Sequence, residues 1–203
     1  MNEVVIPCFA SGTHLAAPGG AVAVEDLSVG DAVLTADGER ETVRWIGFRH
    51  VDCARHPRPA TVWPVCIAAG AFGPEMPARD LFLSPDHAIY AEGVLVPVKH
   101  LVNDTSITQQ PVARVTYFHV ELRRHDVLLA EGLPAESYLD TGDRASFTNG
   151  AGFITLHPAW GSAARDVALF LEVVGYAPLA VAGPAVDRLR ARLSQGDSAT
   201  AVA

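Results

Sequence analysis

Residues 8–47 of this 203-residue chain read CFASGTHLAAPGGAVAVEDLSVGDAVLTADGERETVRWIG, and they decide its fold. In this stretch short β-branched runs alternate with turn residues, a pattern typical of strands joined by tight turns. Residues 32–35 and 42–47 lie on either side of Asp37-Gly38, a dipeptide that strongly favours a two-stranded hairpin. We therefore expect a hairpin here, within a chain of many short strands.

The same strand-and-turn pattern continues to about residue 145. Along residues 114–122 alternate side chains suit opposite faces of a sheet, as in a long strand. The 17 glycines and 14 prolines also favour many turns. The sequence predicts an all-β core, with further strands at residues 62–68, 81–83, 88–91, 94–96, 127–130 and 137–139 and loops at residues 50–62 and 70–80.

After residue 145 the pattern becomes partly helical. Apolar residues at helical spacing predict helices over residues 163–174 and 184–193, and the second begins with a proline, which is favourable at a first helical position. We expect three parts in the chain: a short N-terminal flank (residues 1–7), a β domain (residues 8–145) and a partly helical C-terminal extension (residues 146–203).

The composition excludes several classes of protein. The chain is 49% hydrophobic and 19% charged, and its 15 Lys and Arg against 23 Asp and Glu give a formal charge of −8. Such a chain can fold as one globular unit, and it lacks the basic cluster that a nucleic-acid surface needs. The N-terminus has no secretory signal, and the apolar stretch at residues 173–186 is interrupted by glycine and proline and is shorter than the ~20 residues of a membrane span. We expect a soluble protein, cytoplasmic by default, with no nucleic-acid partner and no membrane span.

Three cysteines, Cys8, Cys53 and Cys66, cannot all pair with one another, so at least one thiol is expected to be free. By position alone, Cys8 is explained as a small buried hydrophobic residue, which is a common environment for a free cysteine. The residues that follow Cys8 indicate a reactive role instead.

The segment that begins at Cys8 resembles the start of the Hint superfamily. The likeness is carried by Cys8, Gly12-Thr13, a Val-Glu-Asp-Leu segment at residues 24–27, Gly30-Asp31 and the hairpin that follows. Hint domains are the autoprocessing domains shared by inteins and the C-terminal part of Hedgehog proteins, and this sequence is most similar to their small bacterial branch. The resemblance implies a Hint-type flattened horseshoe of two pseudo-symmetric β halves, with Cys8 as the nucleophile.

Two later blocks follow in the order that the superfamily has them. Ser84-Pro85-Asp86-His87 resembles its Thr-x-x-His block, with Ser in place of Thr. Residues 117–132 resemble a third block, in which His119 falls where an Asp commonly lies and His125 falls where the block has its His. Without the resemblance, His87 is explained as a turn residue and His119 as a buried strand residue bonded to a backbone carbonyl.

The resemblance implies a self-processing reaction that requires no cofactor and no metal. The Cys8 thiolate would attack the carbonyl of Pro7 and convert the Pro7–Cys8 amide into a thioester. His87 would protonate the departing amide nitrogen as a general acid. Ser84 would either orient that imidazole or hydrogen-bond the scissile amide.

In the same scheme, His119 or His125 would assist deprotonation of Cys8 or of the attacking second nucleophile. The substrate would be the chain's own N-terminal segment. The resemblance leaves the acceptor open, and water, a thiol, an alcohol and an amine all fit the chemistry.

The sequence departs from an intein at its C-terminal junction. An intein ends in His-Asn, whose Asn cyclises, whereas Glu131-Gly132 is followed here by LPAES at residues 133–137, and the chain has no His-Asn pair. Asn149-Gly150 is interpreted as a structural turn. We therefore expect N-terminal cleavage or acyl transfer, as in the Hedgehog type, without full splicing. Pro7 restricts the backbone on the acyl side, and the short flank indicates a degenerate or processed copy or a longer upstream protein.

Two other functions are compatible with the sequence. The first is a catalytically silent interaction module on a Hint scaffold, since a fold does not guarantee an activity. The second is a zinc-binding structural protein, with His50-x-x-Cys53-x-x-His56 and Cys66 as the ligands.

Overall fold

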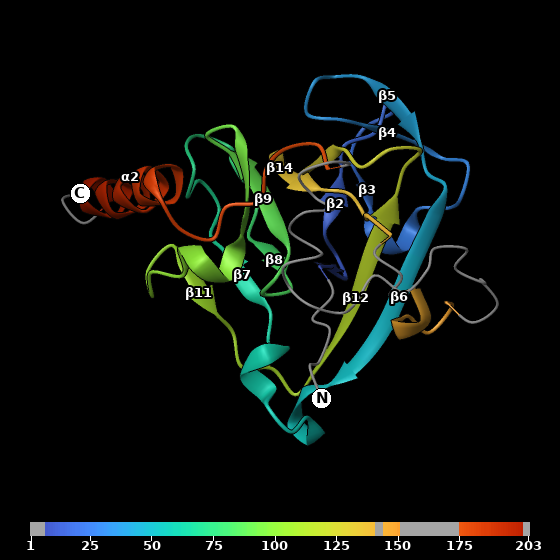
Figure 1. The fold of residues 1–203 in the computed structure, drawn as a ribbon, viewed down its shortest axis with the longest axis horizontal. Helices are drawn as coiled ribbons and strands as arrows, with labels where there is room; N and C mark the ends of the chain where they lie inside the picture. The colour runs from blue at the N-terminus through green and yellow to red at the C-terminus, as the bar shows by residue number, and fades with distance from the viewer. Residues whose placement is uncertain (1–6, 141–143, 151–174, 201–203) are drawn as a thin grey trace.

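The computed structural model describes residues 7–140, 144–150 and 175–200 of the chain. Figure 1 shows two large sheets, a smaller hairpin and a C-terminal helix. The helix expected over residues 163–174 and most of the N-terminal flank lie outside the described residues. Among the residues that are described, no helix is long and apolar enough to cross a membrane.

The first sheet has six strands in the order β11-β7-β8-β1-β12-β6, and all neighbours are antiparallel. Its longest pairing joins β12 to β6, the two long strands that run side by side in Figure 1, and places His119 opposite Gly47. β1 lies between β8 and β12. The strands are β1 (Phe9–Ala10), β6 (Trp45–Asp52), β7 (Val65–Ile67), β8 (Leu81–Leu83), β11 (Ile107–Gln109) and β12 (Arg114–Glu121).

The second sheet also has six antiparallel strands, in the order β10-β9-β14-β13-β2-β3, and the pair β4-β5 forms a separate hairpin. Its strands are β2 (His14–Leu15), β3 (Val22–Ala23), β9 (Ala88–Ala91), β10 (Val94–Pro97), β13 (Val127–Ala130) and β14 (Leu133–Glu136). The hairpin comprises β4 (Ala32–Leu34) and β5 (Arg40–Thr42). The helices are η1 (Val24–Asp26), η2 (Cys53–Arg55), η3 (Pro59–Thr61), η4 (Val98–Leu101), η5 (Arg144–Ser146), all of the 3-10 type, and α2 (Pro184–Thr200).

The chain passes directly from the first sheet to the second in three places. These passages join β1 to β2, β8 to β9 and β12 to β13. They consist of residues 11–13, 84–87 and 122–126. The three passages begin at β1, β8 and β12, which are adjacent strands of the first sheet. They therefore bring residues that are far apart in sequence to the boundary between the two sheets.

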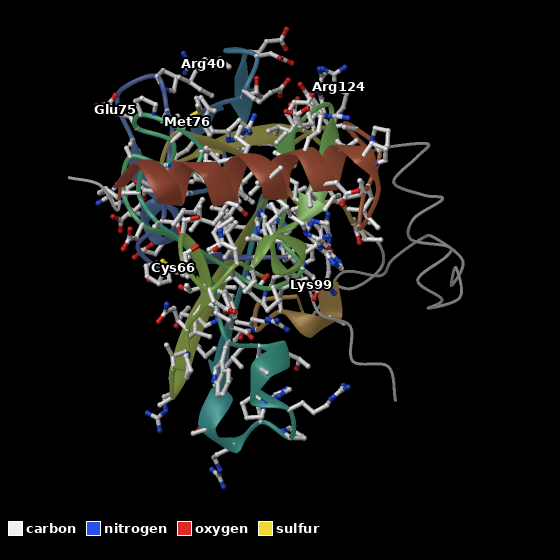
Figure 2. The ribbon with its side chains drawn as sticks, turned by 90° about the vertical axis from the view of Figure 1, so that its left-hand side faces the viewer. Arg40, Cys66, Glu75, Met76, Lys99 and Arg124 are labelled. Carbon is white, nitrogen blue, oxygen red and sulfur yellow. The ribbon has the colours of Figure 1, made fainter. Side chains whose placement is uncertain are left out.

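Helix α2 is part of the same folded unit as the sheets. Val186, Leu189 and Leu193 follow helical spacing on one face of α2, and all three are buried in the main hydrophobic core with strand residues. On its exposed side Arg188 and Arg192 form ion pairs with Glu92, in the turn between β9 and β10. Figure 2 shows α2 running across the front of the strands. The predicted helix at residues 184–193 is thus confirmed, and it extends to Thr200.

The all-β prediction with a helical tail is confirmed, and so is the hairpin at Asp37-Gly38, where Gly38 adopts a left-handed φ of 79°. Two boundaries were wrong. The return strand expected at residues 42–47 is divided between β5 and β6, and β6 continues to Asp52, into the expected loop. This extension follows from β12, which pairs with β6 along its whole length.

The strand expected at residues 137–139 was also wrong, because the strand of this region is β14, at Leu133–Glu136. Pro134 disguises it in the sequence, since proline cannot donate a ladder hydrogen bond. In the structure Pro134 lies opposite Leu129, in a position next to the closed end of a two-residue hairpin, where antiparallel strands leave a pair unbonded. The Leu129 carbonyl accepts from Ala16 of the neighbouring segment instead.

Candidate functional site

The candidate residues lie at the boundary between the two sheets. Cys8 immediately precedes β1, Ser84 and His87 lie on the passage from β8 to β9, and His119 lies on β12. His125 lies on the passage from β12 to β13. All five side chains are buried, so the fold brings together residues that the sequence separates by more than a hundred positions.

Cys8 and Ser84 are joined by two hydrogen bonds. The backbone N–H of Cys8 donates to Oγ of Ser84 over 2.8 Å, and the backbone N–H of Ser84 donates to the Cys8 carbonyl over 2.9 Å. Cys8 is completely buried and Ser84 is 1% exposed. The hydroxyl therefore contacts the nitrogen of the Pro7–Cys8 amide directly, which is one of the two arrangements expected for Ser84.

His87 packs against the residue that follows Cys8. Its ring centroid lies 4.3 Å from that of Phe9 and 5.3 Å from that of His119. The backbone N–H of His87 donates to the Ser84 carbonyl over 3.0 Å, so a tight turn fixes the backbone of His87 relative to Ser84. Among the described residues neither ring nitrogen of His87 has a partner in hydrogen-bond geometry, although both are buried.

His119 lies on β12, the strand next to β1, at the position opposite Cys8. β1 pairs with β12 so that Phe9 is opposite Phe118, and continuing this register by one residue places Cys8 opposite His119. Side chains at opposite positions of an antiparallel pair lie on the same face, with Cβ atoms ~5 Å apart. The ring of His119 also packs edge-on against Tyr138 at 5.1 Å, and its buried nitrogens lack a partner in hydrogen-bond geometry within the described parts of the chain.

Burial dominates the electrostatics of these two histidines. It lowers the pKa of His87, and this lowering is opposed by the Glu136 carboxylate and by the carbonyls of Cys8 and Glu136. The two carbonyls lie close enough to the His87 ring to influence its pKa, although neither forms a hydrogen bond with a ring nitrogen. Burial, followed by the neighbouring His87 and His125, holds the pKa of His119 well below its ordinary value. His119 is thus a neutral imidazole, able to accept a proton, whereas His87 has a nearby negative charge that favours its protonated form.

His125 contacts the site through Glu136. Nδ1 of His125 accepts the backbone N–H of Tyr176 over 3.0 Å, and its Nε2 lies 3.6 Å from Oε2 of Glu136. The other oxygen of Glu136 accepts the backbone N–H of Ala88, the residue after His87, over 2.7 Å. Sequence reasoning missed Glu136 and Tyr176. A charged residue at the end of an otherwise apolar strand is the signal that would have drawn attention to Glu136, whereas a backbone N–H such as that of Tyr176 leaves no signal.

An open depression of about 430 Å³ lies on the β6 side of this centre, and its walls include Arg49, His50, Asp52 and Phe147. The guanidinium of Arg49 lies 5.8 Å from the ring centre of Tyr117, the residue opposite Ala10 on β12. Arg49 also contributes to lowering the pKa of His119. Arg49 thus both lines the open depression and influences the pKa of the buried His119.

The residues of the zinc alternative do not converge. His50 bonds through Nδ1 to Oγ1 of Thr116 at 2.9 Å, and Nδ1 of His56 accepts a backbone N–H. The thiol of Cys53, the first residue of η2, donates to the carbonyl of Val51 in β6 over 3.9 Å, and Cys66 is buried in β7. Within residues 7–140, 144–150 and 175–200, no three His, Cys, Asp or Glu side chains form a group that could hold a metal ion. Asn149 takes the structural role expected of it, because its side chain bonds both to the N–H of Phe48 and to the carbonyl of Ile46.

One family profile and several solved structures are similar to this chain. The sequence profile of the Hint domain family matches residues 7–142. Among solved structures, the bacterial intein-like domain from Clostridium thermocellum is 16% identical, and the match covers 64% of this chain and 98% of that one with a TM-score of 0.43. The DnaB intein from Synechocystis sp. PCC 6803 is 9% identical, with 66% and 99% covered and a TM-score of 0.45. No curated protein sequence matches.

Proposed function

Because the chain belongs to the Hint domain family, we propose that it is a self-processing domain that cleaves or transfers its own N-terminal segment at the Pro7–Cys8 bond, without full splicing. The observation that carries the proposal is the hydrogen bond from the Cys8 N–H to Ser84, with His87 fixed beside it by the Ser84 carbonyl. These contacts support the proposal, because the Ser84 hydroxyl accepts the N–H of the amide that the Cys8 thiol would attack and the backbone of His87 is bonded to Ser84.

The first step is an acyl shift from nitrogen to sulfur. The Cys8 thiol loses its proton, its sulfur bonds to the carbonyl carbon of Pro7, and the bond from that carbon to the Cys8 nitrogen breaks. The nitrogen gains a proton from His87 and leaves as an amine. The products of this step are a thioester on Cys8 and a free amino group on the same residue.

His119 is the group best placed to take the proton of the Cys8 thiol. The register puts His119 opposite Cys8 on the same face, and burial, which lowers its pKa, favours the neutral ring that can accept a proton. The two nitrogens of His125 face the Tyr176 N–H and Glu136 instead. Of the two histidines that the sequence left open for this role, the geometry favours His119.

The second step is attack on the thioester by an acceptor, which takes the acyl group and returns a proton to the Cys8 sulfur. Cleavage without an Asn cyclisation step follows from the residues at the end of β14, where Glu136-Ser137 stands and no His-Asn pair exists in the chain. The acceptor is the component that the product mass identifies, because water, a thiol, an alcohol and an amine each leave a different group on the released segment.

The decisive experiment is intact mass spectrometry of a fusion that carries a longer N-terminal reporter. We expect cleavage between Pro7 and Cys8, faster release with a thiol, and a hydroxamate product with hydroxylamine. Cys8→Ala should abolish cleavage and His87→Ala should slow it. Cys66→Ala is a matched control, because it removes another buried thiol that lies in β7 and outside the site.

A fusion that stays intact after prolonged incubation, with and without these nucleophiles, would contradict the proposal. That result would leave the catalytically silent interaction module as the remaining function. Cleavage that persists in Cys8→Ala would equally contradict it, since no thioester could then form at this position.

A further inference from the structure

Glu136 is a buried carboxylate that the reaction above does not use. It is 5% exposed and ends β14, in the second sheet. Its two oxygens face two different N–H groups: Oε1 accepts from Ala88 over 2.7 Å, and Oε2 faces Nε2 of His125 at 3.6 Å. A carboxylate can accept at both oxygens, whereas a glutamine amide could accept at only one of them. In this structure the one hydrogen bond of these two contacts is that from Ala88, and the contact with His125 is a longer one between Oε2 and the ring nitrogen.

The C-terminal segment fixes the orientation of His125 toward this carboxylate. The Tyr176 N–H donates to Nδ1, so Nδ1 carries a lone pair and a neutral ring must hold its proton on Nε2, facing Glu136. Tyr176 is itself held by a hydrogen bond from its hydroxyl to Asp37 and by edge-on packing against Tyr90. Glu136 is thus fixed at Oε1 by the N–H of Ala88, and its Oε2 faces the ring of His125.

The position of Glu136 places its charge beside His87. Ala88, which anchors Oε1, is the next residue after His87, and the carboxylate is the strongest influence that opposes the effect of burial on His87. Among the other titratable groups of the described residues, His125, on the passage between the sheets, lowers the pKa of both His87 and His119. Arg49, on β6, and His87 itself lower the pKa of His119. Within the part of the chain that the structure describes, Glu136 is the negatively charged group that influences the pKa of His87.

We propose that Glu136 is a positioning residue of the proposed self-processing reaction: its carboxylate, fixed by the Ala88 N–H and facing His125, provides the negative charge that counteracts burial and so increases the fraction of His87 that carries a proton for transfer to the Cys8 nitrogen. The inference rests on the proposed function for its catalytic consequence, but the charge relation between Glu136 and His87 can be measured without any cleavage. Glu136 itself does not touch the reacting atoms and gives up no proton.

The test in the active fusion is the pH dependence of cleavage. Glu136→Gln removes the charge, so the pH at which His87 loses its proton should fall by about one unit or more, since a neighbouring opposite charge typically shifts a pKa by roughly 1–3 units. Above both midpoints the variant should cleave at least about tenfold more slowly, and the two rates should converge at lower pH. Glu136→Asp retains the charge and should retain the midpoint, even if its rate is lower at every pH.

A purely structural role would predict a different result, namely an equal loss of rate at every pH. Glu131→Gln is the matched control, because Glu131 is also a buried carboxylate that accepts a backbone N–H, but at the β13–β14 turn, where it pairs with Arg79. Its midpoint should stay that of the wild type. An unshifted midpoint in Glu136→Gln would overturn the inference while leaving the proposed cleavage in place.

The second measurement uses the Cys8→Ala chain, which cannot form a thioester. The imidazole resonances of His87 are followed by NMR through a pH titration, with and without Glu136→Gln. A midpoint about one unit lower in the double variant supports the charge relation, and an unchanged midpoint refutes it. A shifted midpoint in a chain whose parent fusion never cleaves would refute the proposed function alone.

Discussion

Ser84→Ala removes the hydroxyl that accepts the N–H of Cys8 over 2.8 Å. Both residues are at most 1% exposed, so water cannot replace the lost acceptor without opening the structure. Leaving a buried backbone donor unpaired costs about 1–3 kcal/mol, and we expect the free energy of unfolding to fall by this amount. Cleavage at Pro7–Cys8 should also slow, by roughly 3- to 10-fold, if the hydroxyl contributes one ordinary hydrogen bond to the orientation of the amide.

Stability is measured by urea unfolding in the Cys8→Ala background, so that processing cannot interfere, and the rate is measured in the active fusion. Thr35→Val is the matched control, because Thr35 is 1% exposed and its hydroxyl also accepts a backbone N–H, that of Glu39, in the β4–β5 hairpin. It should lose comparable stability and cleave at the wild-type rate. A Ser84→Ala chain that loses less than about 0.5 kcal/mol and cleaves normally would refute the reasoning.

Three further predictions concern stability and reactivity. Burial lowers the pKa of His87 and His119, so the unfolded chain binds more protons than the folded one below pH ~6.5. The free energy of unfolding should therefore fall on acidification, by up to about 1.4 kcal/mol per pH unit for each histidine. Urea titrations at several pH values measure this fall, and a flat profile would contradict it. Burial raises the pKa of the Cys66 thiol to about 11, so iodoacetamide at pH 8 should label this thiol roughly a hundredfold more slowly in the native chain than in the unfolded chain. Rapid labelling of the native chain, measured by peptide mass spectrometry, would refute this. Leu189→Ala in α2 should cost about 2–5 kcal/mol by denaturant unfolding, whereas the exposed Val181→Ala should stay within about 0.5 kcal/mol; equal effects would show that α2 does not stabilise the core.

The elements that the sequence specified well are those whose signal is local. Asp37-Gly38 between two β-branched runs predicted the hairpin, and alternation along residues 114–122 predicted the whole of β12. β14 escaped detection because Pro134 makes the segment look like a break in the strand pattern. A strand tolerates a proline only where the proline nitrogen faces away from the hydrogen-bonded partner. In β14 this orientation depends on the register of the β13–β14 hairpin, which the Glu131-Gly132 turn sets.

The site could be predicted as far as side-chain chemistry appears in ordered motifs. Cys8, Ser84, His87, His119 and His125 came from such motifs, and the structure places them in one buried centre. The contacts that connect them could not be predicted, because they join distant positions through backbone groups. The partner of Glu136 is the N–H of Ala88, 48 positions away, and the partner of His125 is the N–H of Tyr176, 51 positions away. Every non-proline residue has a backbone N–H, so the sequence does not show which of these groups a buried side chain will bond to.

The hydrogen bond between Cys8 and Ser84 has a consequence for the reverse reaction. In the proposed acyl shift the leaving group is not released, because the new amine remains on Cys8, and Oγ of Ser84 can hold it where the amide N–H was held. An amine kept within reach of the thioester carbonyl attacks it with an effective molarity that reaches ~10⁵ M in well-oriented systems. The amide would therefore re-form faster than a dilute acceptor arrives, and the thioester would be a minor species in rapid equilibrium with its parent. Net processing would then be governed by how often an acceptor intercepts that minor species.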